Sequence, residues 1–145
     1  ILGQVPLVRV HEIIEAVPLS AELQSFVRDN ADRCFVVTGN LDVWIAPMVA
    51  RLGCRAFSSS AMVTPSGVQL HSILAKDDAV RLLRRQGGYE RIVAVGDGAN
   101  DVPMLREADI GVAYGGVHAP APQTIAVADI VVNDASSLCK LLKAL

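Results

Sequence analysis

The sequence lacks several features that mark whole classes of protein. Its 145 residues carry 13 basic and 15 acidic side chains, and no Lys/Arg run is longer than the pair Arg84 and Arg85. A nucleic-acid or membrane-surface partner would need a concentrated basic patch, so we expect neither. Charged residues, glycine or proline interrupt every apolar stretch well before the roughly 18 residues that a membrane-spanning helix needs. We therefore expect a soluble protein of one domain whose partner is a small molecule.

Cysteine is scarce as well. Cys34, Cys54 and Cys139 make an odd number, and no two of them have the CxxC spacing. This argues against a disulfide framework or a zinc site and is typical of a reduced, cytoplasmic protein whose cysteines fill apolar space. The chain begins with Ile1 and has no basic and apolar regions typical of a signal peptide. We expect translation to begin upstream of this residue.

Apolar patterning predicts strands that alternate with helices. Short strands are predicted at residues 34–37, 54–58, 92–95, 110–113 and 130–132, with a hairpin about residues 64–67. Helices are predicted at residues 7–17, 21–30, 43–52, 76–86, 100–107 and 121–127, with a last helix from Ser136. Strands separated by helices pair in parallel through right-handed crossovers. The pattern therefore predicts the α/β class, as an open parallel sheet with helices on both faces and a small β-hairpin.

Polar side chains follow the predicted strands at the edge where a ligand is expected. In open α/β sheets, ligands bind outside the carboxyl ends of the strands, because loops and helix N-termini converge there. Thr38 and Gly39 follow the strand at 34–37, and the sequence GDGAND follows the strand at 92–95. Lys76 opens the helix between them. The sequence thus predicts two carboxylates, one ammonium, one hydroxyl and one carboxamide at a single rim.

Asp97 and Asp101 lie four residues apart across this glycine-rich turn. Two carboxylates at a buried edge repel each other unless a cation neutralises them. Mg²⁺ favours one or two carboxylates together with waters and substrate phosphate oxygens. We therefore expect Mg²⁺ as the cofactor at Asp97 and Asp101, with Lys76 and Thr38 holding a phosphate group.

Each of these residues also has a purely structural interpretation. Asp101 alone could cap the helix that begins beside it, and Thr38 alone could be an ordinary strand-ending residue. Lys76 alone could be a solvated lysine at a helix start. Gly96 and Gly98 could begin a dinucleotide fingerprint, but Asp101 occupies the third glycine position.

Other polar residues have weaker signals. Asp77 and Asp78 are expected to stabilise the start of their helix through its dipole. The three histidines, among them His118, lack metal-ligand spacing. Residues 114–118 follow a predicted strand end, so this segment either contacts a leaving group or forms a structural turn.

The order of these motifs resembles the haloacid dehalogenase superfamily, and its phosphoserine-phosphatase-like branch in particular. The likeness rests on VVTGN at 36–40, Lys76 at a helix start, GDGANDVPML at 96–105 and ADIGVA at 108–113. It covers the chain from about residue 30 to the C-terminus. The resemblance implies the phosphatase fold of that family, with a helical cap beside a Rossmann-like core.

The resemblance also implies a role for each matching residue. Thr38 would place its hydroxyl on the phosphate, Lys76 would be the lysine of the family's third sequence motif, and Asn100 would contact phosphate. Asp97 would be a magnesium ligand, and Asp101 would be its partner near the metal. The catalytic set is then Thr38, Lys76, Asp97 and Asp101, and the substrate-binding set is Thr38, Gly39, Asn40, Lys76 and Asn100.

The chain departs from the family pattern in one place. Members begin with an apolar strand carrying DxDx[TV], whose first aspartate attacks phosphorus and whose second is the general acid and base. This chain contains no such motif, and Asp29 and Asp32, its only aspartates before residue 34, lie on or just after the end of a polar helix. We expect the motif on a segment upstream of Ile1. Residues 1–145 are then a single core domain, with residues 1–19 as the end of a helical cap.

Three functions follow as hypotheses. In the first, the complete protein is a cytoplasmic, magnesium-dependent phosphoric monoester hydrolase that acts on a small phosphorylated metabolite through an aspartyl-phosphate. In the second, the chain is a non-catalytic relative that binds a phosphorylated ligand or partner. The third rests on the likeness of GDGxND and ADIGVA to the phosphorylation domain of P-type cation pumps, although the sequence has no membrane-spanning pattern. The phosphomonoester and the oligomeric state stay open.

Overall fold

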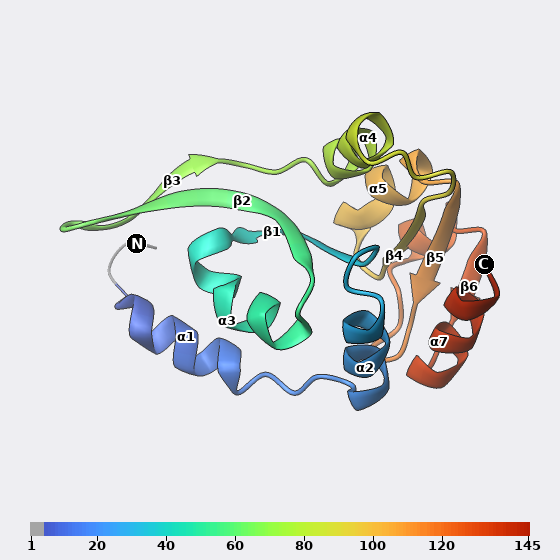
Figure 1. Cartoon of the computed structure of the whole chain (residues 1–145), viewed down its shortest axis with the longest axis horizontal. Helices are drawn as coiled ribbons and strands as arrows, with labels where there is room; N and C mark the ends of the chain where they lie inside the picture. The colour runs from blue at the N-terminus through green and yellow to red at the C-terminus, as the bar shows by residue number, and fades with distance from the viewer. Residues whose placement is uncertain (1–4) are drawn as a thin grey trace. The chain divides into compact units, whose positions relative to one another are not determined.

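A computed structural model describes residues 5–145 of the chain (Figure 1). Its helices and strands form two compact units, a first unit that ends at Leu74 and a second unit that spans Ala75–Leu145. Each unit contains a three-stranded sheet. The predicted α/β class with parallel strands is confirmed, whereas the single domain over residues 1–145 stays a prediction. Within residues 5–145, no helix combines the length and apolar character that crossing a membrane requires.

The first unit combines three helices with the sheet β1-β2-β3. The helices are α1 (Leu7–Glu15), α2 (Ala21–Asp29) and α3 (Asp42–Leu52), and the strands are β1 (Phe35–Leu41), β2 (Arg55–Thr64) and β3 (Gly67–Ser72). β1 and β2 are parallel, and β2 and β3 are antiparallel. Figure 1 shows β2 and β3 as a long, curved ribbon. The predicted hairpin about residues 64–67 is therefore confirmed.

Local sequence signals explain most of these bounds. The hydroxyl of Ser20 accepts a hydrogen bond from the backbone N–H of Leu23 at 3.4 Å, as expected of an N-cap. Gly53 ends α3 with a φ of 70°, the left-handed conformation that favours glycine. β1 runs beyond its predicted end to Leu41, because Leu41 is buried and pairs with Ser59 of β2.

Two of the three cysteines, Cys54 and Cys139, are buried, as predicted for cysteines that fill apolar space, whereas Cys34 is partly exposed. None of the three forms a disulfide. Cys34 and Cys54 immediately precede the paired strands β1 and β2. Burial is the main cause that raises the pKa of both thiols. Both thiols are therefore protonated and poorly nucleophilic at neutral pH.

The second unit contains the all-parallel sheet β4-β5-β6. Its strands are β4 (Val93–Gly96), β5 (Ile110–Tyr114) and β6 (Ile130–Val132). Its helices are α4 (Lys76–Gln86), the 3₁₀ turn η2 (Ala99–Asp101), α5 (Val102–Glu107), α6 (Pro122–Ile125) and α7 (Ala135–Ala144). α5 contacts α4, β4 and β5, and Val112 and Ala113 of β5 are fully buried. The predicted strands are confirmed.

The last helix begins at Ala135 instead of the predicted Ser136. The reason is Asp134, whose carboxylate accepts a hydrogen bond from the backbone N–H of Ser137 at 2.8 Å and so caps the helix. This hydrogen bond is the main cause that lowers the pKa of Asp134.

Two aspartates set the register of the second sheet. The sequence ADI occurs directly before β5 and again before β6. The carboxylate of Asp109 accepts a hydrogen bond from the Ile92 N–H at 2.7 Å, and the Asp109 N–H donates to the Ile92 carbonyl at 2.9 Å. Asp129 makes the same two bonds to Gly111, at 2.7 and 2.8 Å. Each aspartate thus ties the start of its strand to the neighbouring strand.

We expect the Asp109 bond to stabilise the fold less in acid. The hydrogen bond from Ile92 and then that from Arg84 lower the pKa of Asp109. Its stabilising effect is therefore present above the unfolded pKa of about 3.9 and is lost as the pH falls through the lower folded value. Asp109→Asn should reduce the difference in unfolding free energy between pH 7 and pH 3, measured by urea denaturation. Glu90→Gln, at an exposed site, is the control. An unchanged difference in Asp109→Asn would contradict this role.

Candidate functional site

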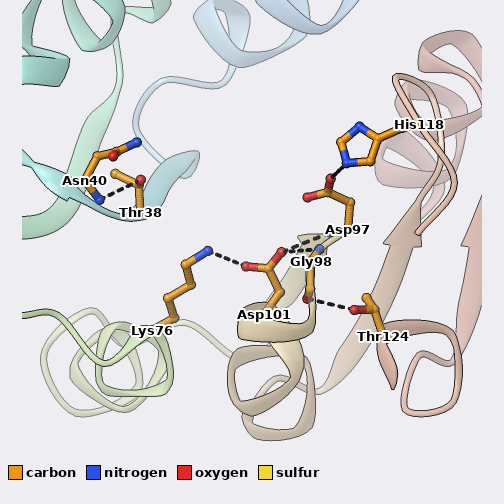
Figure 2. Close-up of polar contacts among 8 residues, drawn as sticks. All are labelled: Thr38, Asn40, Lys76, Asp97, Gly98, Asp101, His118 and Thr124. Carbon is orange, nitrogen blue, oxygen red and sulfur yellow. Dashed lines mark hydrogen bonds and ion pairs between the residues drawn. The ribbon is translucent and has the colours of Figure 1, made fainter. Parts of the chain in front are cut away.

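The acidic loop, residues 96–101, lies at the carboxyl end of β4 in the second unit. β4 ends at Gly96, and the 3₁₀ turn Ala99–Asp101 leads directly into α5. The loop thus occupies the edge of a parallel sheet at which ligands bind in this class of fold. Figure 2 shows Asp97, Gly98 and Asp101 of this loop together with Lys76, His118 and Thr124.

Asp101 lies at the centre of the acidic loop. Its side chain is only 7% exposed. Its Oδ2 accepts hydrogen bonds from the backbone N–H groups of Asp97 and Gly98, each at 3.0 Å. Its Oδ1 accepts a hydrogen bond from Nζ of Lys76 at 2.5 Å (Figure 2). One buried carboxylate therefore holds the loop backbone and also neutralises a lysine, which satisfies the requirements of a buried charge.

These contacts support one structural interpretation of the sequence in part and correct another. Asp101 makes no side-chain cap of α5, but its carboxylate accepts the N–H of Gly98, the N-cap of the 3₁₀ turn that leads into α5. Lys76 is not a solvated lysine, because its side chain is 14% exposed and its ammonium pairs with Asp101. In contrast, Asp77 and Asp78 do lie in the first turn of α4, as predicted.

The Asp97 carboxylate is partly exposed to solvent. Its side chain is 41% exposed, and its Oδ2 lies 2.7 Å from Nε2 of His118. Figure 2 shows the His118 ring turned toward this carboxylate. His118 follows β5 and is itself 68% exposed. Asp97 is therefore the accessible acid of the loop, whereas Asp101 is the buried one.

The acidic loop has one carboxylate that is accessible to a ligand. Among residues 5–145, no group of three or more His, Cys, Asp or Glu side chains is arranged to hold a metal ion. Mg²⁺ needs only one or two protein carboxylates when waters and phosphate oxygens complete its shell. The exposed carboxylate of Asp97 fits such a role. Both oxygens of Asp101 already have partners, so its direct role at a metal stays a prediction.

The predicted residues of the first unit lie on a bulge at the end of β1. The pairing of β1 with β2 is regular up to Thr38 and resumes at Leu41, so Gly39 and Asn40 leave the ladder. Both are exposed, and the Asn40 N–H donates to the hydroxyl of Thr38 at 3.1 Å (Figure 2). Bulges often redirect side chains next to binding sites. That this bulge and the acidic loop lie at one rim stays a prediction. The contact of Asn100 with phosphate also stays a prediction, and its side chain is exposed.

Two residues that contact the acidic loop have no signal in the sequence. The hydroxyl of Thr124 donates to the Gly98 carbonyl at 2.7 Å, and the Ala121 N–H donates to the Asp97 carbonyl at 2.8 Å. Thr124 is 26 residues from its partner. No local pattern marks a contact of this kind, because the sequence around Thr124 does not differ from that of an ordinary buried segment. Its complete burial in the structure is the signal that reveals it.

Gly96 leaves room for the carboxylate of Asp101. A Cβ added to Gly96 would lie 2.6 Å from the Cβ of Asp101 and 2.7 Å from its Oδ2. Non-bonded atoms of these kinds repel strongly at such distances. Glycine is therefore required here by the close approach of a neighbour and not by a left-handed backbone.

Comparison with known proteins agrees with this fold and loop. A family model described as haloacid dehalogenase-like hydrolase matches residues 5–106. A phosphoserine phosphatase of Mycobacterium tuberculosis is 31% identical over 114 residues, which are 72% of this chain and 28% of that protein. A zinc-transporting ATPase of Synechocystis sp. is 27% identical over 116 residues, which are 79% of this chain and 14% of that protein. The chain thus spans a minor part of the length of these relatives.

Solved structures give the same picture of the fold. A probable phosphoserine phosphatase from Vibrio cholerae has a TM-score of 0.78 at 26% identity, covering 99% of this chain and 48% of that chain. A phospho-aspartyl intermediate analogue of phosphoserine phosphatase has a TM-score of 0.78 at 23% identity, covering 97% and 72%. The catalytic domain of a CPx-ATPase has a TM-score of 0.63 at 23% identity, covering 88% and 46%. The fold predicted from the sequence is confirmed.

We expect Gly96→Ala to displace Asp101 and to lower the free energy of unfolding by about 2 kcal/mol, the usual cost of overpacking. Thermal denaturation measures the change. Gly39→Ala is the matched control for stability, because a methyl group there would meet no atom within 4 Å. A melting temperature of Gly96→Ala equal to that of the wild type would show that the close approach is not required.

Proposed function

The chain belongs to the haloacid dehalogenase-like hydrolase family, and from this premise we propose that the complete protein is a magnesium-dependent phosphatase of small phosphomonoesters. One observation carries the proposal. It is the accessible carboxylate of Asp97, which lies at the carboxyl end of a parallel strand, in a loop that the Lys76–Asp101 pair holds. The phosphoserine phosphatases among the similar proteins support a phosphomonoester as substrate.

In this proposal the nucleophile lies outside the 145 residues. An aspartate of a DxDx[TV] strand attacks phosphorus and displaces the alcohol, and water then cleaves the aspartyl-phosphate to release phosphate. Within the described part of the chain, β1 and β4 each lie at an edge of their own three-stranded sheet. Each of these strands can therefore accept a further strand by backbone hydrogen bonding.

The residues of this chain bind and orient the phosphoryl group. Asp97 holds the metal ion, which when bound neutralises phosphate charge. An ammonium group has three N–H donors, so Lys76 can keep its bond to Asp101 while it donates to a phosphate oxygen. The hydroxyl of Thr38 and the carboxamide of Asn100 bind the remaining oxygens. Asp101 acts on the substrate only through Lys76 and through the loop backbone that it holds.

A second candidate function is favoured by the transport ATPases among the relatives. In this alternative the chain is part of a phosphorylation domain that accepts a phosphoryl group from ATP. A third candidate, a module that binds phosphate without hydrolysis, applies if no aspartate occupies the nucleophile position of the complete protein. The sequence upstream of Ile1 discriminates among the three, since the phosphatase requires DxDx[TV].

We expect the intact protein to release phosphate from p-nitrophenyl phosphate when Mg²⁺ is present. Asp97→Asn should lower kcat/KM by roughly 100-fold or more, because it removes the negative charge that holds the metal ion. Asp78→Asn is the control, since that carboxylate is 64% exposed on α4. A wild-type protein that binds inorganic phosphate but hydrolyses nothing would establish the binding module instead.

We also expect Lys76→Met to weaken inhibition by inorganic phosphate about tenfold, since it removes a charge-assisted hydrogen bond. The inhibition constant in the same assay measures the effect. Lys140→Met, at an exposed position of α7, is the control, and melting temperatures verify folding. An inhibition constant that Lys76→Met leaves unchanged would rule out the phosphate contact.

A further inference from the structure

The backbone of the acidic loop is held from two sides. Asp101 accepts hydrogen bonds from the N–H groups of Asp97 and Gly98, as described above. The carbonyls of the same two residues accept hydrogen bonds from the N–H of Ala121 at 2.8 Å and from the hydroxyl of Thr124 at 2.7 Å. The Gly98 carbonyl also accepts a hydrogen bond from the Asp101 N–H at 2.9 Å. All four backbone polar groups of Asp97 and Gly98 therefore have partners.

Thr124 is well placed to hold a neighbour. Its side chain is fully buried. Its backbone is fixed in the α6 turn, where its N–H donates to the Ala121 carbonyl at 2.9 Å and its carbonyl accepts from the Ala128 N–H at 3.1 Å. A carbonyl is only an acceptor, so the hydroxyl of Thr124 must act as the donor to Gly98. Figure 2 shows this contact on the side of the loop away from Lys76.

Bonds on both sides of a peptide group limit its rotation. The peptide that joins Asp97 to Gly98 is bonded to Ala121 through its carbonyl and to Asp101 through its N–H. The direction of the Asp97 side chain follows from this peptide, because the side chain leaves from the α-carbon at one end of it. Within the described residues, the Asp97 carboxylate itself has one polar side-chain contact, to the exposed His118. The Thr124 hydroxyl restrains the next peptide, between Gly98 and Ala99, through the Gly98 carbonyl. The backbone restraints therefore decide where the Asp97 side chain leaves the loop.

We propose that Thr124 is a positioning residue, which acts with the N–H of Ala121 to hold the Asp97 carboxylate in the orientation that binds the metal ion. This inference rests on the proposed function of Asp97. The Asp101 carboxylate holds the two N–H groups of the loop. Ala121 holds the Asp97 carbonyl, and Thr124 holds the Gly98 carbonyl together with the Asp101 N–H. A carboxylate that is only partly exposed and must meet a small, strongly hydrated cation needs both restraints.

Three variants of the complete protein test the proposal. Thr124→Val keeps the shape of the side chain and removes the hydroxyl, whereas Thr124→Ser keeps the hydroxyl. Ala121→Pro replaces the N–H that donates to Asp97 by a ring carbon, which pushes the Asp97 carbonyl away, while the φ of Ala121, −59°, is one that proline adopts. Ala121→Pro leaves the buried hydroxyl of Thr124 in place, so it releases the carbonyl side of the loop even if Thr124→Val fails to fold. Leu138→Ala, on the buried face of α7, is the control for general destabilisation.

The measurement is the dissociation constant of Mg²⁺ alone, by isothermal titration calorimetry, together with kcat and KM for p-nitrophenyl phosphate. We expect Thr124→Val and Ala121→Pro to bind Mg²⁺ at least about fivefold more weakly, with a fall in kcat larger than the change in KM. Thr124→Ser should stay within about twofold of the wild type. Leu138→Ala should lower the melting temperature and leave the Mg²⁺ dissociation constant unchanged.

Two results would overturn the proposal. In the first, Thr124→Val lowers the melting temperature but binds Mg²⁺ as the wild type does, which would make Thr124 merely structural. In the second, Thr124→Ser loses as much affinity as Thr124→Val, so the hydroxyl is not the cause. If the wild type itself binds no Mg²⁺, the proposed function fails. Amide hydrogen exchange at Gly98 then tests whether Thr124 holds the backbone of the acidic loop. Faster exchange in Thr124→Val would support this role of Thr124, and unchanged exchange would reject it.

Discussion

The buried carboxylate of Asp101 is the group on which the site depends. It accepts hydrogen bonds from one ammonium and two backbone N–H groups, and so connects the start of α4 to the loop after β4. A buried carboxylate without such partners would be strongly unfavourable, so the loop and Lys76 must adopt positions that satisfy it. The lysine and the loop geometry are therefore coupled, and the space that Gly96 leaves is part of the same arrangement.

The two acids of the loop differ because their surroundings differ. Asp101 is 7% exposed, and its charge is used within the protein, whereas Asp97 is 41% exposed and meets only a surface histidine among its described polar side-chain contacts. Two carboxylates four residues apart thus avoid mutual repulsion without sharing a cation, since one of them pairs with Lys76. This leaves Asp97 as the acid that is accessible to a metal ion or a ligand.

The parallel sheet explains why distant segments meet at the acidic loop. β4 and β5 are parallel neighbours, so the loops that follow them leave the same edge of the sheet. Asp109 and Asp129 tie each strand start to its neighbour and keep the strands in register. The loop after β5 therefore reaches Asp97 with His118, and the turn that follows reaches the carbonyl side of the acidic loop with Thr124.

The sequence alone determined the strands, the hairpin, the start of α4 at Lys76 and the acidic turn after β4, because apolar periodicity and glycine-rich turns are local signals. It also showed which residue types gather at the strand ends. Only the tertiary structure decided that Asp101 holds the loop, that β1 continues through a bulge at Gly39, and that Thr124 contacts Gly98. These features depend on partners that are remote in the sequence or on competition among several donors for one carboxylate. The Thr124 contact and the bulge of β1 exist only once the strands are paired. The bonds of Asp101 within its own loop are local, but Lys76, 25 residues away, shares the same carboxylate, and no pattern of neighbouring residues encodes that pairing.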